Sequence, residues 1–245
     1  MRKVRVKVIT LGHMPPHINM ERVRAWSSQI FEIVGSIENH DIRCDSDGDG
    51  WEFSDLLLSE QIREDNSVDF VFAVTNVPLA MSYYSRRIGN NRTILTLYEI
   101  KEYLKQENIP LENVLLRVLY AYTLLFIRSG NRIPNSTEAA IYTHDETRGC
   151  LYDMNGVKSD IVESCVTPIV CSDCQERMKK QHVSNNVISI AQYEIKRIRK
   201  PAYFRALDFV KTKPVTALII SSLFALLIGI TGSLIASYIF EAARQ

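Results

Sequence analysis

The stretch "SVDFVFAVTNVPL", residues 67–79, decides the fold class of this chain. Its apolar residues run from Val68 to Val74 with a single interruption at Asp69. A short apolar run bounded by polar and turn-forming residues is typical of a strand that is buried on both faces. We therefore predict a buried strand here, around which the other elements are arranged.

Strand-like and helix-like patterns alternate on both sides of this segment. Near the start of the chain, valines alternate with Arg5 and Lys7, as expected for a strand with one buried face. In "SDLLLSEQIRE", Ser54 is placed to cap the start of a helix. The alternation predicts an α/β fold, a mixed sheet with flanking helices, and leaves α+β as the alternative. We predict strands at residues 3–11, 36–44 and 93–97, and helices at residues 20–35, 54–64, 100–106 and 111–128.

The formal net charge of the 245-residue chain is only +1, but its charges are unevenly distributed. Residues 177–213 carry ten Lys or Arg side chains against Glu194 and Asp208, and residues 215–240 carry no charge. We therefore predict four parts: a cytosolic α/β domain at 1–142, a zinc-binding module at 143–180, a basic juxtamembrane linker at 181–213 and a transmembrane helix at 214–241.

The start of the chain predicts the cellular compartment of the N-terminal domain. "MRKVRVKVITLGHM" is basic, but no apolar run of signal-peptide length follows it, so we expect the N-terminal domain to stay in the cytoplasm. The five cysteines of the chain would then lie in a reducing compartment, where disulfides are rare.

Four potential metal ligands occur as two close pairs. His144 and Cys150 form H-x5-C, Cys171 and Cys174 form C-x2-C, and twenty residues separate the pairs. Two such pairs at this distance are typical of a structural tetrahedral Zn²⁺ site. Cys165 could replace His144 as the fourth ligand. A redox dithiol at the C-x2-C pair and buried thiols without metal remain as alternatives.

The segments "RTILTLYEI" (92–100), "LENVLLRVLYAYTLLF" (111–126), "HDETRGCLYDM" (144–154) and "CSDCQERM" (171–178) follow one another along the chain. This order resembles the archaemetzincin-like peptidases, in which a strand precedes a helix with a His-Glu-x-x-His zinc motif and a cysteine-rich second zinc site follows. The predicted helix 111–128 departs from that pattern because it contains no His. The resemblance therefore implies a degenerate scaffold that kept a structural zinc ion and no catalytic residue.

Three other segments contain candidate ligand-binding residues. "DSDGDG" begins like a calcium loop, but Leu56 occupies the position of the bidentate acidic ligand, which favours an acidic turn. His13 and His17 lie in a Pro-rich loop and could contribute to a metal site at a strand end. Aromatic and Arg side chains together suit phosphates or nucleotides, and they occur in "YYSRRIGNNR". The candidates in that segment are Tyr84, Arg86, Arg87 and Arg92.

Residues 215–240 are long and apolar enough to cross a bilayer. The basic residues before this segment predict that the N-terminal part stays on the cytoplasmic side of an inner or plasma membrane. Small residues recur within it at every fourth position, a spacing that lets membrane helices approach closely, so we expect a homo-oligomer. The stripe comprises Ala217, Ser221, Ala225, Gly229, Ser233 and Ser237.

Together these features predict a membrane-anchored, zinc-stabilised and non-catalytic sensor or effector that oligomerises through its membrane helix. Its trigger would be a small molecule or a protein, and we expect no specific nucleic-acid partner. Bacterial antiphage membrane effectors have this layout. Two alternatives remain: a membrane-tethered metallohydrolase with a rebuilt site near His13 and His17, and a passive adaptor that recruits a cytosolic partner.

Overall fold

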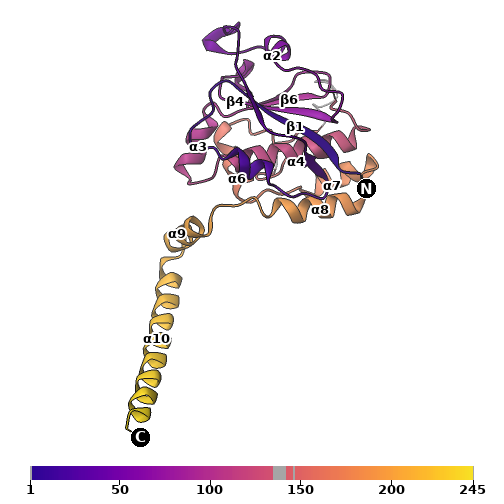
Figure 1. The fold of residues 1–245 in the computed structure, drawn as a ribbon. Helices are drawn as coiled ribbons and strands as arrows, with labels where there is room; N and C mark the ends of the chain where they lie inside the picture. Colours follow the sequence, from indigo (N-terminus) through magenta and orange to yellow (C-terminus); the bar gives the residue numbers. More distant parts are fainter. Residues whose placement is uncertain (1, 135–141, 146, 245) are drawn as a thin grey trace. The chain divides into compact units, whose positions relative to one another are not determined.

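The computed structural model describes residues 2–134, 142–145 and 147–244. The chain forms two compact units, Met1–Arg199 and Lys200–Gln245. The first unit contains the sheet and most of the helices (Figure 1). Its strands are β1 (Val4–Leu11), β2 (Phe31–Ile33), β3 (Glu38–His40), β4 (Phe70–Thr75), β5 (Ser85–Arg87) and β6 (Arg92–Thr96). Its α-helices are α1 (Met20–Arg24), α2 (Asp55–Gln61), α3 (Ile100–Gln106), α4 (Glu112–Arg128), α6 (Ile161–Val166), α7 (Ser172–Lys180) and α8 (Asn185–Ile195).

The sheet is mixed, and β4 lies at its centre between β1 and β6. The order is β2-β1-β4-β6-β5, and β3 pairs with β1 beyond the part of β1 that pairs with β2. These pairings are parallel, except that β5 runs antiparallel to β6. The predicted α/β fold with a mixed sheet is therefore confirmed.

Both faces of the sheet are covered, as the apolar run of β4 predicts. Phe70, Phe72 and Val74 face a core formed with α3, α4, α6, α7 and α8, whereas Val71 and Ala73 face a smaller core that includes Leu58 of α2. Figure 1 shows α2 on one side of the sheet and α4, α6, α7 and α8 on the opposite side. Helix α4 is buried along nearly its whole length, so it forms the centre of the larger core.

The helix predicted at residues 20–35 is wrong beyond Arg24. Helix α1 ends at that residue, and residues 31–33 form β2, which pairs in parallel with β1 through Val4 and Phe31. The Ser28 hydroxyl accepts hydrogen bonds from the backbone N–H groups of Ile30 (3.1 Å) and Phe31 (3.4 Å). This local bonding competes with helical hydrogen bonds, although the spacing of the apolar residues suits a helix.

Most of the other predicted elements agree with the structure, with small shifts at their ends. Ser54 caps α2 as expected, and its hydroxyl accepts from the backbone N–H of Leu57 at 3.2 Å. Residues 36–44 contain only the short strand β3. Within the segment "YYSRRIGNNR", residues 85–87 form the edge strand β5, which was not predicted from the sequence. Strand β5 is polar in sequence because it is held mainly by backbone pairing with β6.

A buried carboxylate joins the last helix of the first unit to the beginning of its chain. Glu194 of α8 accepts hydrogen bonds from Ser28 Oγ (2.6 Å), the Gln29 backbone N–H (2.7 Å) and the Tyr120 hydroxyl (2.7 Å). Trp26 Nε1 donates in turn to the Tyr120 hydroxyl at 2.9 Å. Buried charges require such partners, so this network fixes α8 against α4 and the β2 region.

The second unit contains α9 (Ala202–Thr212) and α10 (Pro214–Ala242). Helix α10 has 29 residues, which at 1.5 Å per residue corresponds to about 43 Å, enough to cross a bilayer. None of its residues is buried, and Thr231 satisfies its hydroxyl by donating to the Leu227 carbonyl at 2.9 Å. The four-part division of the chain stays a prediction, but α8, within the expected linker, belongs to the core of the first unit.

Candidate metal centre

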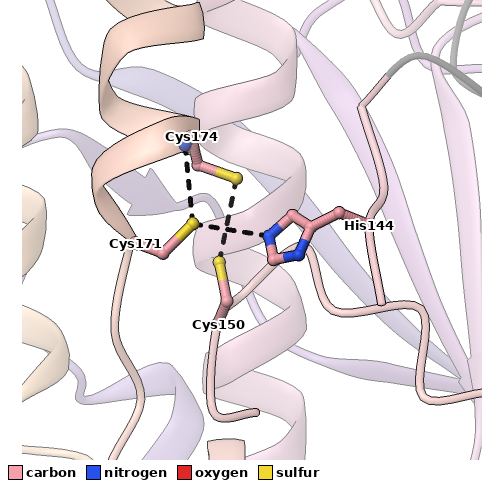
Figure 2. Close-up of side chains that lie close together, drawn as sticks. All are labelled: His144, Cys150, Cys171 and Cys174. Atoms are coloured by element: carbon pink, nitrogen blue, oxygen red, sulfur yellow. Dashed lines mark hydrogen bonds between the residues drawn. The ribbon is translucent and has the colours of Figure 1, made fainter. Parts of the chain in front are cut away.

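Four side chains of the first unit converge on one point, and they are the four predicted ligands. The Nε2 or Nδ1 atom of His144 and the sulfur atoms of Cys150, Cys171 and Cys174 all lie within 4.8 Å of one another. Figure 2 shows the imidazole ring and the three thiols turned toward a common centre. His144, Cys150 and Cys174 are buried, and Cys171 is partly exposed. The four residues therefore form a candidate metal site.

The first pair is positioned by a loop that folds back on itself. The His144 backbone N–H donates to the Tyr152 carbonyl (3.0 Å), and the His144 carbonyl accepts from Met154 (2.9 Å). Gly149 adopts a φ of +82°, and a Cβ atom there would lie 3.3 Å from the Thr167 carbonyl oxygen. A glycine at this position lets the chain turn tightly before Cys150.

The second pair lies at the start of α7. Cys171 is the N-cap residue of this helix, and its sulfur accepts a hydrogen bond from the Cys174 backbone N–H at 3.5 Å. A helix N-terminus favours negative charge, so both thiols are in a position that stabilises thiolates, the form that binds metal. The C-x2-C spacing places the two sulfurs on one turn of the helix.

The distances between donor atoms fit a tetrahedral zinc ion. Zinc–sulfur bonds of about 2.3 Å and zinc–nitrogen bonds of about 2.0 Å imply edges of about 3.8 Å between sulfurs and about 3.5 Å between sulfur and nitrogen. The Cys150 and Cys174 sulfurs lie 3.8 Å apart, and Cys171 Sγ lies 3.5 Å from His144 Nε2. Three thiolates and an imidazole are soft and borderline donors that suit Zn²⁺ rather than Mg²⁺ or Ca²⁺.

One thiol of the Cys150–Cys174 pair is prepared for deprotonation. The hydrogen bond shared with Cys174 is the main cause that lowers the pKa of Cys150 to about 5. The same hydrogen bond and burial raise the pKa of Cys174. Two neighbouring sulfurs therefore hold one proton between them, and a bound cation would replace it, because metal ligands must be deprotonated.

The alternatives for the cysteines fit the geometry less well. A disulfide between Cys150 and Cys174 would need a sulfur–sulfur distance of about 2.05 Å, and the observed distance is 3.8 Å. The C-x2-C pair does open a helix, as a redox pair would, but two further metal donors face it. Cys165 does not join the group: it lies buried in α6, where burial raises its pKa to about 12.

The predicted ligand-binding residues are divided between two places. Tyr84, Arg86 and Arg87 line one cavity, and ligand binding by them stays a prediction. Arg92 does not line it, because its Nη1 atom donates to the carbonyls of Ser59 (2.8 Å) and Ile62 (2.7 Å) at the end of α2. The position and bonding of Arg92 are thus those of a residue that stabilises the end of a helix.

The two histidines near the start of the chain lie apart from the metal centre. His13 and His17 are exposed, and they join no group of three or more metal donors within the described ranges. Helix α4 contains no His. The acidic turn is explained by hydrogen bonding at the start of α2. Asp47 accepts from the Ser54 hydroxyl and from the Ser54 backbone N–H (2.8 Å), and these bonds lower the pKa of Asp47.

Two residues with a bearing on the site were missed by sequence reasoning. Arg117 lies in the middle of α4 and is 1% exposed, and Asp153 follows Cys150 by three residues and is also 1% exposed. Arg117 donates from Nη2 to the Cys150 carbonyl at 3.4 Å and from Nη1 to the Tyr84 hydroxyl at 3.0 Å. The sequence did contain a signal for Arg117, because a charged residue within an apolar helix needs buried partners.

No family model and no curated protein matches this sequence. A solved structure, archaemetzincin from Methanopyrus kandleri, is similar over 74% of this chain and 96% of its own, with a TM-score of 0.46 and 10% sequence identity. This degree of similarity assigns no activity and no residue role to the chain described here.

Proposed function

We propose that this protein is a membrane-anchored, non-enzymatic sensor whose zinc centre stabilises the ligand-binding unit. The cytosolic unit would bind a small-molecule or protein trigger, and α10 would hold it at the membrane and oligomerise. Membership of the antiphage effectors is part of this proposal and rests on layout alone. A passive adaptor differs from this proposal in having no response to a trigger.

The composition of the metal centre is the observation that carries the proposal. His144, Cys150, Cys171 and Cys174 provide four protein donors, which complete a tetrahedral Zn²⁺ shell. Catalytic zinc keeps a position open for water or substrate, whereas a shell of four protein ligands does not. A metal bound here would therefore connect α7 to the loop at 144–150 and supply folding energy rather than catalysis.

The side of α4 that faces the cavity also supports a non-enzymatic function. Val118, Ala121, Tyr122 and Leu125 line the cavity from this helix. None of these side chains is a ligand of the zinc sites found in hydrolases, which use His and carboxylates. The cavity is thus suited to holding a molecule through apolar contacts and hydrogen bonds.

Metal content per chain tests the non-enzymatic assignment. We expect about one zinc ion per chain in the full-length protein purified in detergent, because one four-ligand centre is present among the described residues. Mass spectrometry of the metal against protein concentration measures this ratio. The matched variant His13→Ala/His17→Ala should keep the full metal content. About two ions per chain, with one lost in that variant, would revive the membrane-tethered metallohydrolase.

The second unit supports anchoring and orientation. Helix α10 is apolar on all sides, and the Lys- and Arg-rich residues before it would stay on the cytoplasmic side by the positive-inside bias. Helix α9 carries Tyr203 and Phe204, whose rings meet edge to face at 5.2 Å, together with Arg205 and Lys211. Aromatic and basic residues of this kind suit the membrane interface.

Replacing two small residues of the α10 stripe should abolish self-association. The structure places all six stripe residues on α10, and a Cβ atom at Gly229 would meet nothing within 4 Å in the chain itself. Gly229→Leu/Ser233→Leu should therefore leave the helix intact and block close approach of a second helix. We expect chemical cross-linking in membranes to give oligomers for the native chain and mainly monomer for the variant.

A control for this experiment keeps the volume change off the stripe. Leu227→Phe/Thr231→Leu enlarges two side chains on the opposite face of α10 and should leave cross-linking unchanged. Equal cross-linking of the native chain and the Gly229→Leu/Ser233→Leu variant would exclude a role for the stripe and favour the passive adaptor.

A further inference from the structure

A cavity of about 480 Å³ lies beside the metal centre in the first unit. Its volume is in the range of sites that bind small molecules. Helix α4 provides one wall, the segment around β5 provides another, and residues 142–143 and 151–154 contribute a third. Both polar and apolar groups face it, so the cavity has the character of a binding site.

The cavity has an excess of positive charge. Arg86, Arg87 and Arg117 line it, against the single carboxylate of Asp153. Arg86 is paired with Asp55 at the side of the cavity. The Nε atoms of Arg87 and Arg117 are both buried without a hydrogen-bond partner, but Arg117 donates from its Nη atoms to the Tyr84 hydroxyl and the Cys150 carbonyl. Burial lowers the pKa of the Arg87 guanidinium. An unpaired, partly desolvated guanidinium is the group that an anionic oxygen of a ligand would satisfy.

The carboxylate of Asp153 provides the complementary feature. The residue is 1% exposed, and its Oδ1 atom accepts from the Asn155 backbone N–H at 3.1 Å and lies 3.7 Å from Arg148 Nη1. Its Oδ2 atom is buried without a hydrogen-bond partner. A buried carboxylate oxygen without a donor costs free energy unless a ligand supplies an N–H or O–H group. The ligand therefore needs a donor group as well as an anionic group.

Tyrosine rings provide the apolar part of the lining. Tyr83, Tyr84, Tyr122 and Tyr152 all face the cavity. Arginine guanidinium groups stack against three of the rings, Arg86 on Tyr83 at 4.6 Å, Arg117 on Tyr84 at 5.5 Å and Arg128 on Tyr152 at 5.4 Å. Aromatic rings and guanidinium planes together suit a flat, aromatic ligand.

The loop that supplies metal ligands also lines the cavity. Thr143 and the segment 151–154 face the cavity, while their neighbours His144 and Cys150 face the metal centre. Arg117 connects the two sites, since it lines the cavity and donates to the Cys150 carbonyl at 3.4 Å. A metal bound to His144 and Cys150 would hold this wall of the cavity in place.

We propose that this cavity binds a nucleoside phosphate of mononucleotide size and that the metal centre holds the cavity wall formed by the loop with its ligands. The phosphate lies at Arg87, the base lies among the tyrosine rings, and a base N–H group donates to Asp153. This inference rests on the proposed sensor function and names the chemical class of the trigger. Binding and metal retention are then coupled, and the coupling is reciprocal: each stabilises the other by the same factor.

Titration calorimetry on the full-length, metal-loaded protein in detergent tests the binding. The probes are the four common nucleoside monophosphates, the corresponding nucleosides, inorganic phosphate and free tyrosine. We expect at least one monophosphate to bind at least tenfold more tightly than its nucleoside and than inorganic phosphate. Arg87→Gln should weaken that binding at least tenfold, whereas Arg24→Gln, an exposed arginine of α1, should leave it unchanged.

Metal release provides a readout that does not require a folded metal-free protein. A saturating monophosphate should slow the transfer of zinc to a chromophoric chelator at least fivefold in the native chain and not in Arg87→Gln. No binding, equal binding in Arg87→Gln, or binding of phosphate or tyrosine alone would overturn the nucleotide site. Unchanged zinc release with bound nucleotide would overturn the coupling. A second metal ion per chain would contradict the proposed function instead, whatever the nucleotide result.

Discussion

Cys174→Ser is expected to release the metal and to lower the free energy of unfolding by about 4 kcal/mol or more, because structural zinc supplies folding energy directly. Cys174 is completely buried, and its sulfur lies 3.8 Å from that of Cys150. Without this ligand, the three remaining donors do not complete a tetrahedral shell, so their polar atoms stay buried close together without a metal ion. Metal content and urea denaturation, measured on the same full-length preparation, check both effects.

Cys165→Ser is the matched control for this prediction. Cys165 is equally buried, but it lies in α6 outside the metal group. The change should cost about 1–2 kcal/mol, since a hydroxyl replaces a buried thiol, and the metal should stay bound. A chelator should then destabilise the native chain and Cys165→Ser and have no further effect on Cys174→Ser. Retention of the metal by Cys174→Ser would contradict the four-ligand centre.

Leu227→Arg/Ile228→Arg should release the protein from membranes. Both residues lie near the middle of α10, and each arginine at the centre of a membrane helix costs about 2.5–3.5 kcal/mol. The pair would remove about 5–7 kcal/mol from the free energy of insertion. We expect the native chain to resist extraction by alkaline carbonate and the variant to appear in the soluble fraction.

The same two charges placed at the start of α10 give a positional control. In Val215→Arg/Ala217→Arg the guanidinium groups could reach the interface, so the protein should stay in the membrane fraction. If the central arginine pair left the protein as resistant to carbonate as the native chain, α10 would not be a membrane span.

The elements that the sequence predicted well are those whose signal is local. The apolar run of β4 and the helical pattern of α4 each lie within one segment, and both are confirmed. The metal ligands were predictable for the same reason, because each pair lies within a few residues. Residues 20–35 were mispredicted because Ser28 hydrogen-bonds to the backbone and diverts the chain from a helix into β2.

The cavity could not be predicted because its groups come from distant segments. Arg87, Arg117 and Asp153 lie far apart in the sequence, and each alone has an ordinary explanation. Arg92 shows the converse: it belongs to the same basic segment as Arg87, yet its guanidinium stabilises the end of α2. Charge in a sequence predicts that partners exist, whereas the fold decides whether they are backbone carbonyls or a ligand.

The carboxylate of Glu194 has a consequence for biosynthesis. It accepts hydrogen bonds from Ser28 and Gln29, about 165 residues earlier in the chain, and from Tyr120. A ribosome synthesises those donors long before their acceptor, so the β2 region and α4 must wait for α8 before their polar groups are satisfied. Nascent chains that end before Glu194 would therefore expose unpaired polar groups and apolar surface to chaperones and proteases. The first unit would complete its fold only shortly before the apolar helix α10 is made.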